Sequence, residues 1–243
     1  MRIAILGGGC SGLVTAWLLQ HHHQVEVFEK IHPWGSCPDV EQECSCSSLL
    51  RAHGNCHTLS FSMKKYVAII RGINVGGHNR VNMKQLREAL EKLKFQEVQT
   101  YIQSGNIVFR SEETSVPSLE SAVGKVLKSK FDVTVPVIVR DEKEWKKTVR
   151  GNPFLDRTEE LTKLLVTFLS ARPAPADVKA IAQESFPHDE FAVLGKDVYV
   201  FCKEGYGKTD IPNLFFEKKL RVNGTTRNWR TVLEIEKMLT QAG

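Results

Sequence analysis

The chain has 243 residues, of which 42% are hydrophobic and 25% are charged. These proportions are typical of a globular protein and exclude a wholly disordered chain. The length allows one large or two small domains with a hydrophobic core. No run approaches the ~18 apolar residues that cross a bilayer, so we expect no membrane-spanning segment.

Charge and cysteine content both divide the chain near Met63. The chain has 33 Lys and Arg residues and 28 Asp and Glu residues. Three of the basic and five of the acidic residues precede Met63, so the part from Met63 onward has 30 basic and 23 acidic residues. The basic surplus of the longer part is compatible with an anionic partner. Five of the six cysteines also precede Met63, and only Cys202 follows it. A disulfide-built secreted domain would spread its cysteines through the fold, so we expect a reduced, cytoplasmic protein.

The first 30 residues have the pattern of a dinucleotide-binding βαβ unit. Residues 2–6 are a short apolar run typical of a buried strand, residues 7–12 match G-x-G-x-x-G, and residues 25–28 predict a second strand. In such a unit three glycines allow a tight turn, a close approach to pyrophosphate and helix–strand packing, and an acid binds the ribose. The residues at these positions are Gly7, Gly9, Gly12 and Glu29.

This segment resembles the N-terminus of FAD-dependent amine-oxidase-like oxidoreductases, which implies FAD as a cofactor. The resemblance covers only residues 1–30, because residues 31–36 lack the basic residue and glycine pair that follow in those families. About 30 residues cannot close a dinucleotide-binding sheet. We therefore interpret the segment as a truncated FAD/NAD(P)-binding-like fragment and expect no cofactor for the rest of the chain.

Residues 31–62 show no sustained period of 2 or 3.6 and are rich in Cys, Ser and His. We interpret them as an irregular linker. Their cysteines and histidines do not have the paired spacing of structural zinc ligands, so no metal site is predicted. The alternative is a segment read out of frame between two recognisable sequences.

The segment after Met63 begins with elements in the order β-α-β-β-α-β. The predicted strands cover residues 66–70, 98–103, 106–110 and 133–139. One helix follows the cap residue Asn82, and another begins at Pro117. Ser104-Gly105 is a two-residue hairpin signal, and Pro136 places the last strand at a sheet edge. This order is the ferredoxin-like, or split βαβ, pattern.

Residues 141–243 repeat this order with one element missing. The predicted strands cover residues 163–169, 191–194 and 198–202. A linking helix is capped by Asp141 and ends at Gly151, and another helix begins at Pro175. Asp210 and Thr226 are expected to cap the last two helices, which leaves no clear fourth strand.

The predicted fold class is α+β: two ferredoxin-like (split βαβ) halves, preceded by a short Rossmann-type βαβ fragment. Three segments are predicted: the fragment over residues 1–30, the linker over residues 31–62 and a main domain over residues 63–243. The halves of the main domain cover about residues 63–140 and 141–243.

Four stretches after Met63 carry a second resemblance: YVAIIRGINVGGHNRVNMKQLREAL, VQTYIQSGNIVF, GNPF and LFFEKKLRVNGTTRNWRTV. They resemble the bacterial DUF 1697 family, a domain of unknown function, over about residues 64–239. The resemblance implies a small cytoplasmic α/β protein. It implies no reaction.

Three polar motifs lie at predicted turns, where binding residues often sit on a rigid scaffold. Their residues are, in chain order, Arg71, Asn74, Gly76 and Gly77; Gln103, Ser104 and Asn106; and Thr226, Arg227 and Asn228. The first suits an anion cradle of backbone N–H groups, and the third suits a phosphate or carboxylate at a helix N-terminus. The alternatives are a loop that needs glycine, a hairpin turn and a helix cap.

Lys208 lies in Gly205-Tyr206-Gly207-Lys208-Thr209, which partly matches a phosphate-binding P-loop. The glycine required five residues before Gly207 is replaced by a cysteine, so ATP hydrolysis is not predicted. Lys208 remains a candidate source of positive charge. No Ser-His-Asp or Cys-His set stands out after Met63, so the catalytic residues, if any, are unknown.

The leading hypothesis is a binding module for an anionic ligand, either phosphate-bearing or a nucleic acid. An FAD-dependent oxidoreductase is the alternative that the N-terminal motif favours. A protein-interaction or scaffold domain is the third, because a ferredoxin-like fold does not determine function.

Overall fold

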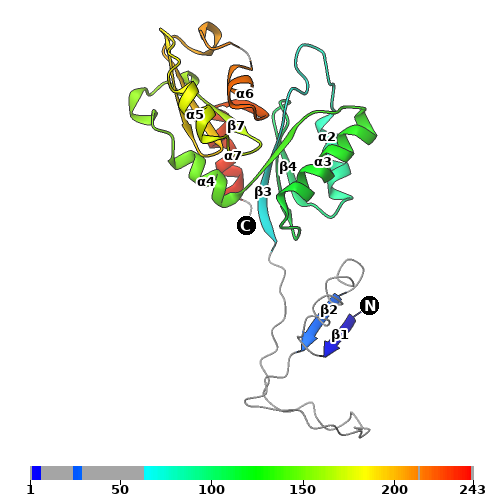
Figure 1. Cartoon of the computed structure of the whole chain (residues 1–243). Helices are drawn as coiled ribbons and strands as arrows, with labels where there is room; N and C mark the ends of the chain where they lie inside the picture. Colours follow the sequence, from blue (N-terminus) through cyan, green and yellow to red (C-terminus); the bar gives the residue numbers. More distant parts are fainter. Residues whose placement is uncertain (1, 7–23, 29–62, 213, 242–243) are drawn as a thin grey trace, which may run out of the picture. The chain divides into compact units, whose positions relative to one another are not determined.

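The computed structural model describes residues 2–6, 24–28, 63–212 and 214–241 (Figure 1). The chain forms two units, Met1–Ser62 and Met63–Gly243. In the first unit, β1 (Arg2–Leu6) and β2 (Gln24–Phe28) pair in parallel, as a βαβ unit requires. The predicted glycine loop, the helix, Glu29 and the junction lie outside the described residues.

The first half of the second unit has the predicted ferredoxin-like order. Its elements are β3 (Lys64–Ile70), α2 (Met83–Glu91), β4 (Gln96–Tyr101), β5 (Asn106–Ser111), α3 (Val116–Phe131) and β6 (Val137–Asp141). The sheet order is β4-β5-β3-β6, and every neighbouring pair is antiparallel. The predicted edge strand is confirmed as β6.

Two local predictions for this half are corrected. The chain between β4 and β5 is a four-residue turn over residues 102–105, so the two-residue hairpin was wrong. Pro136 lies before β6 and not within it, because proline has no N–H for a sheet ladder. The predicted cap is confirmed: the Asn82 side chain accepts a hydrogen bond from the Gln85 N–H at 3.1 Å.

The second half has four strands, so the expectation of three was wrong. Its elements are α4 (Glu142–Arg150), β7 (Leu164–Leu169), α5 (Pro175–Ile181), β8 (Asp189–Leu194), β9 (Asp197–Cys202), α6 (Phe215–Leu220), β10 (Gly224–Asn228) and α7 (Trp229–Gln241). The order β10-β7-β9-β8 repeats that of the first sheet. Short 3-10 turns cover Leu155–Arg157, Leu161–Lys163 and Tyr206–Lys208.

The missed strand explains two further corrections. Thr226 lies in the middle of β10 and caps no helix; the Asn228 side chain instead accepts from the Thr231 N–H at 2.8 Å at the start of α7. Asp210 does not cap α6, which begins after Leu214 in a left-handed conformation with φ of 64°. The sequence Gly-Thr-Thr-Arg-Asn has no apolar alternation, so its pairing with β7 was not visible in the sequence.

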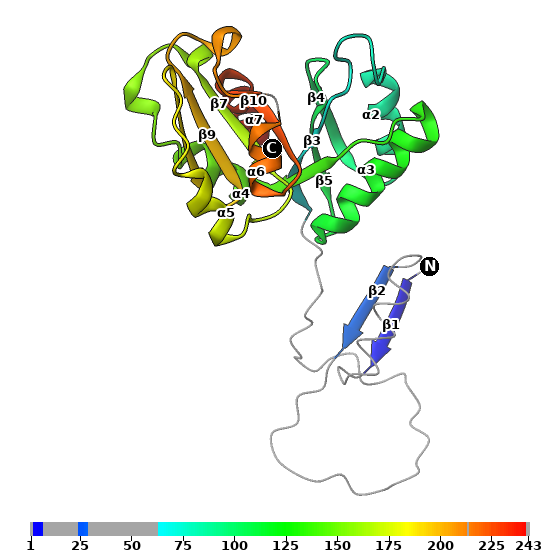
Figure 2. The ribbon, with the colours of Figure 1, turned by 45° about the horizontal axis from the view of Figure 1, so that its top comes forward.

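Helices and sheets of this unit form alternating layers (Figure 2). Helices α2 and α3 cover the outer face of the first sheet, and α5 and α6 lie over the outer face of the second. Helices α4 and α7 pack between the sheets, where Trp145 and Trp229 are fully buried. Among the described residues, no helix has the length and hydrophobicity needed to cross a membrane.

Candidate functional site

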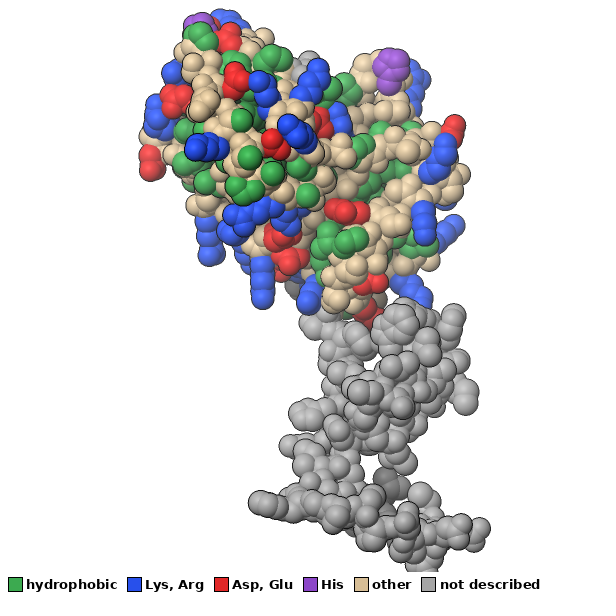
Figure 3. All heavy atoms as spheres, viewed as in Figure 1, with side chains coloured by type: hydrophobic (Ala, Val, Ile, Leu, Met, Phe, Trp, Pro, Cys, Tyr) green, Lys and Arg blue, Asp and Glu red, His purple; other side chains and the backbone are tan. Residues whose placement is uncertain are grey.

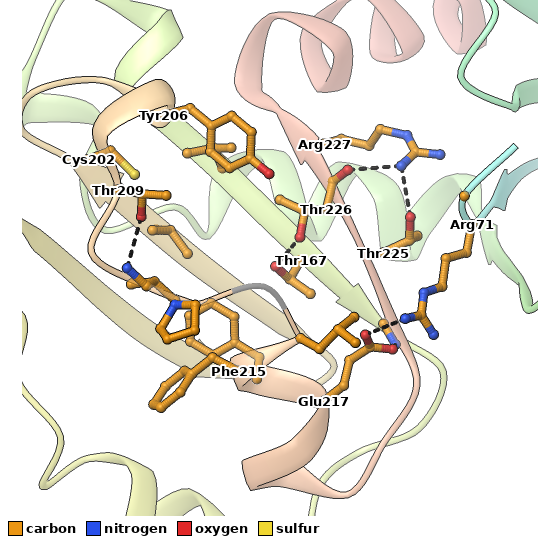
Figure 4. Close-up of a pocket in the computed structure, with 18 of the residues that line it drawn as sticks. Arg71, Thr167, Cys202, Tyr206, Thr209, Phe215, Glu217, Thr225, Thr226 and Arg227 are labelled. Carbon is orange, nitrogen blue, oxygen red and sulfur yellow. Dashed lines mark hydrogen bonds and ion pairs between the residues drawn. The ribbon is translucent and has the colours of Figure 1, made fainter. Parts of the chain in front are cut away.

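A cavity of about 490 Å³ lies against the outer face of the second sheet (Figure 4). Strands β7, β9 and β10 form its floor, α6 and the segment before it form one wall, and the β3–α2 loop contributes Arg71, Gly72 and Val75. We call it the Arg71 cavity. Its volume is within the range of roughly 300–1,000 Å³ that small-molecule sites have.

Arg71 and Glu217 form an ion pair at one end of this cavity. Arg71 Nη2 lies 2.8 Å from Glu217 Oε2, and the other carboxylate oxygen accepts from the Gly224 N–H at 2.7 Å. The Arg71 side chain is 30% exposed, and its Nε and Nη1 donate no hydrogen bond to any described residue. These two donors are therefore available to a ligand.

The floor carries hydroxyl groups and a buried thiol. Thr167 Oγ1 and Thr226 Oγ1 lie 2.8 Å apart on paired positions of β7 and β10. Burial raises the pKa of the Cys202 thiol to about 12, so the thiol remains protonated at neutral pH. A protonated thiol is a poor nucleophile, and the Cys202 side chain is buried in the hydrophobic core of this half.

The mouth of the cavity is apolar. Val75, Tyr206 and Leu214 line it with exposed fractions of 63%, 54% and 48%. Behind them, Phe215 and Phe216 stack edge-on with each other and with Phe191. Large exposed apolar side chains around a hollow are typical of a binding surface.

Arg227 lines the cavity and also joins the two halves of the unit. Its Nε donates to Asn106 Oδ1 at 2.6 Å, and its Nη2 donates to the carbonyls of Ile70 and Ser104, both at 2.8 Å. Its Nη1 donates to Thr225 Oγ1 and to the Thr226 carbonyl, also at 2.8 Å. All five acceptors are neutral, and burial lowers the pKa of Arg227 to about 10.

The other predicted residues lie either near the Arg227 hydrogen bonds that join the two halves, which we call the seam, or at the surface. Asn74 Nδ2 donates to the Gln103 carbonyl at 2.9 Å, and Asn106 Nδ2 donates to Ser104 Oγ at 3.0 Å, so these four brace the loops. Gly76 and Gly77 have positive φ in the β3–α2 loop. Of the eleven candidates after Met63, the residues that line the Arg71 cavity are Arg71, Thr226 and Arg227.

The last two candidates are Lys208 and Asn228, which also lie outside the cavity lining. Lys208 is 71% exposed and 3.5 Å from Glu204. Asn228 caps α7. Neither lines the cavity, although Tyr206 and Thr209 beside Lys208 do.

Sequence reasoning missed Glu217, Thr167 and the aromatic wall. Glu217 lies within the Phe-Phe-Glu-Lys-Lys run that carries the family resemblance, but no spacing rule connects it with Arg71. Thr167 reads as an ordinary strand residue because its partner strand was not recognised.

Comparison with protein-family models identifies residues 63–199, more than half of the chain, as "Protein of unknown function (DUF1697)". The chain belongs to this family. A second model, an NAD(P)-binding Rossmann-like domain, matches residues 5–58 of this DUF1697 protein. That match includes Gly7, Gly9, Gly12 and Glu29, and it extends past residue 30, where the resemblance seen in the sequence ended.

Among solved structures, the conserved bacterial protein SP0830 from Streptococcus pneumoniae is similar with a TM-score of 0.58 and 23% identity. The similarity covers 73% of this chain and 99% of that one, and it shows the fold alone. A search of curated proteins gives no match.

Proposed function

We propose that the Met63–Gly243 unit binds a small molecule with an anionic group and an apolar body in the Arg71 cavity. The observation that carries this proposal is the surplus of positive charge in a partly apolar hollow. Two arginines and one glutamate line the cavity. Arg227 contacts only neutral oxygens, so Glu217 offsets Arg71 and nothing offsets Arg227 within the lining.

The two ends of the cavity differ in chemistry, which supports an amphipathic ligand. Arg71 and Glu217 lie at one end, Tyr206 and Thr209 at the other, and Thr167 and Thr226 between them (Figure 4). A guanidinium with unused donors forms charge-assisted hydrogen bonds with a phosphate or carboxylate. Phe215, Phe216 and the apolar mouth provide the surface for the rest of the ligand.

Isothermal titration with three aromatic probes tests this proposal. Phenyl phosphate and benzoate carry the anionic group, and benzyl alcohol lacks it. We expect the two anions to bind and the alcohol to bind at least tenfold more weakly. Arg71→Met removes a charge-assisted interaction of about 1.5–3 kcal/mol, so phenyl phosphate affinity should fall roughly 10- to 100-fold.

Arg172→Met is the matched control. Arg172 is exposed and does not line the cavity, so its loss should leave affinity within about twofold. Equal affinity for benzyl alcohol and phenyl phosphate, or equal losses in the two variants, would contradict anion recognition by Arg71.

A second candidate function, dinucleotide binding by the N-terminal unit, is favoured by the Rossmann-like match over residues 5–58. The parallel pairing of β1 and β2 is consistent with such a unit. Gly7, Gly9, Gly12 and Glu29 would hold the dinucleotide. The purified full chain, incubated with FAD and desalted, should then keep the flavin absorbance, and Gly9→Val should lose it. A colourless wild-type protein that also fails to bind NADPH would exclude this candidate.

A further inference from the structure

Helix α4 presents a face of basic side chains outside the Arg71 cavity. Lys143, Lys146, Lys147 and Arg150 are spaced by three or four residues, which places them on one side of the helix. Together with Gly151 they line a hollow of about 480 Å³, and its lining includes no carboxylate. We call this surface the α4 basic face. Figure 3 shows basic side chains gathered over the region of α4, with acidic ones beside them.

Local stability accounts for only part of this arrangement. Lys146 pairs with Glu142 at 2.5 Å, whereas no ion pair of the described residues includes Lys143, Lys147 or Arg150. Each of the four cations has two like-charged neighbours at i ± 3 or i ± 4, and each such pair destabilises a helix by roughly 0.2–0.5 kcal/mol. The helix dipole favours Lys147 and Arg150 in the last turn but disfavours Lys143 in the first turn.

The opposite side of α4 is anchored in the protein, so the basic face is held in place. Trp145 is fully buried between the sheets and its indole N–H donates to the Val232 carbonyl at 3.3 Å. Thr148 Oγ1 hydrogen-bonds to Asp197 Oδ2 at 2.7 Å. Gly151, at the end of the helix, also fits closely against the fold, because a Cβ there would lie 2.9 Å from the Lys147 carbonyl oxygen and 3.0 Å from the hydroxyl of the buried Tyr199.

We propose that the α4 basic face binds the phosphate backbone of a nucleic acid. From Lys143 to Arg150 the helix rises about 10 Å, the length of about three phosphates along one strand. Protein partners normally bury apolar anchors, and the lining of this face contains only Lys, Arg and Gly. Nucleic-acid interfaces are instead polar and strongly positive. Since no aromatic residue lines the face, bases have no stacking platform and binding is independent of sequence.

Fluorescence anisotropy with labelled oligonucleotides of about 20 nucleotides, single-stranded and duplex, tests this proposal on the full chain at low salt. Lys143→Glu with Lys147→Glu reverses two charges on the face, and we expect affinity to fall by more than roughly tenfold. The matched control is Lys125→Glu with Lys130→Glu, two exposed lysines of α3 that change the net charge equally. The control should lose less than about threefold.

A salt titration separates contact from general attraction. The variant Lys143→Gln with Lys147→Gln should lower the slope of log K against log salt by about 1 for each lysine in contact. If circular dichroism shows that the charge-reversal variant does not fold, this glutamine variant replaces it in the affinity measurement. Equal losses in the α4 and α3 variants, an unchanged salt slope, or no binding by the wild type would overturn the proposal. Tighter binding of polyglutamate than of the oligonucleotides would assign the face to an acidic protein partner and would also overturn it.

Discussion

The two halves of the main unit have the same strand order but differently covered outer faces. In the first half, α2 with 9 residues and α3 with 16 bury the outer face of the sheet in a continuous core. In the second half, α5 has 7 residues and α6 has 6, and the Arg71 cavity lies beside α6. The same strand order therefore does not fix how the outer face is covered, and the half with the shorter helices is the one that holds the cavity.

The largest expected effect concerns the seam that joins the halves. Arg227→Met leaves the buried Asn106 side chain and the Ile70 and Ser104 carbonyls without their donor. Because each unsatisfied buried group costs about 1–3 kcal/mol, we expect the free energy of unfolding to fall by roughly 3–5 kcal/mol. Urea unfolding measures this change. Two separate transitions in the variant would show that Arg227 makes the halves one cooperative unit, whereas an unchanged midpoint would contradict its role.

The next effect compares equivalent hairpins of the two halves. Gly105 and Gly195 both have positive φ, of 80° and 68°. A Cβ at Gly105 would lie 2.9 Å from atoms of Ile70 and Ile73, whereas a Cβ at Gly195 would meet nothing within 4 Å. Gly195→Ala should therefore cost only the backbone strain of about 1–2 kcal/mol, and Gly105→Ala about 2–4 kcal/mol. Equal melting temperatures of the two variants would mean that the first half tolerates repacking as readily as the second.

A smaller effect concerns the ion pair between Arg71 and Glu217 in the Arg71 cavity. Glu217→Gln keeps an acceptor for the Gly224 N–H but removes the negative charge that competes for Arg71. We expect phenyl phosphate to bind several-fold more tightly, a change of about 1 kcal/mol. Titration of the variant beside the wild type measures it, and Glu184→Gln on the surface is the control. Weaker binding by Glu217→Gln would mean that the carboxylate itself contacts the ligand.

The smallest effect is a pH dependence at the cavity floor. Burial raises the pKa of the Cys202 thiol from its ordinary value of 9.0 to about 12. The unfolded chain therefore loses this proton first, so the stability that the neutral thiol contributes is present below pH 9 and is lost between pH 9 and about 12. The melting temperature of the wild type should fall more steeply with pH across this range than that of Cys202→Ala. Equal slopes of melting temperature against pH would mean that the thiol titrates normally in the folded protein.

Much of the fold could be predicted because its signals are local. The cap residues Asn82 and Asp141 accept the hydrogen bonds expected of them, and most strands were found from their apolar residues. β10 was missed because its own residues lack the apolar alternation of a strand, and its contacts come from distant segments. Thr226 pairs with Thr167 of β7, and Arg227 is buried only because the first half covers it. The same limit applies to the site, where Arg71 was found as a polar residue after a strand but its partner Glu217 was not.

The sequence by itself determined the family, the two-part organisation, the split βαβ order and the identity of the polar motifs, since these depend on composition and short-range periodicity. The tertiary structure alone decided which motifs share a surface. It placed Arg71 in an open cavity, buried Arg227 and Asn106 against each other, and joined the part-buried Asn74 to loop residues of the first half. The reason is that burial and pairing across the fold set the role of a polar side chain, and its sequence neighbours carry no record of either.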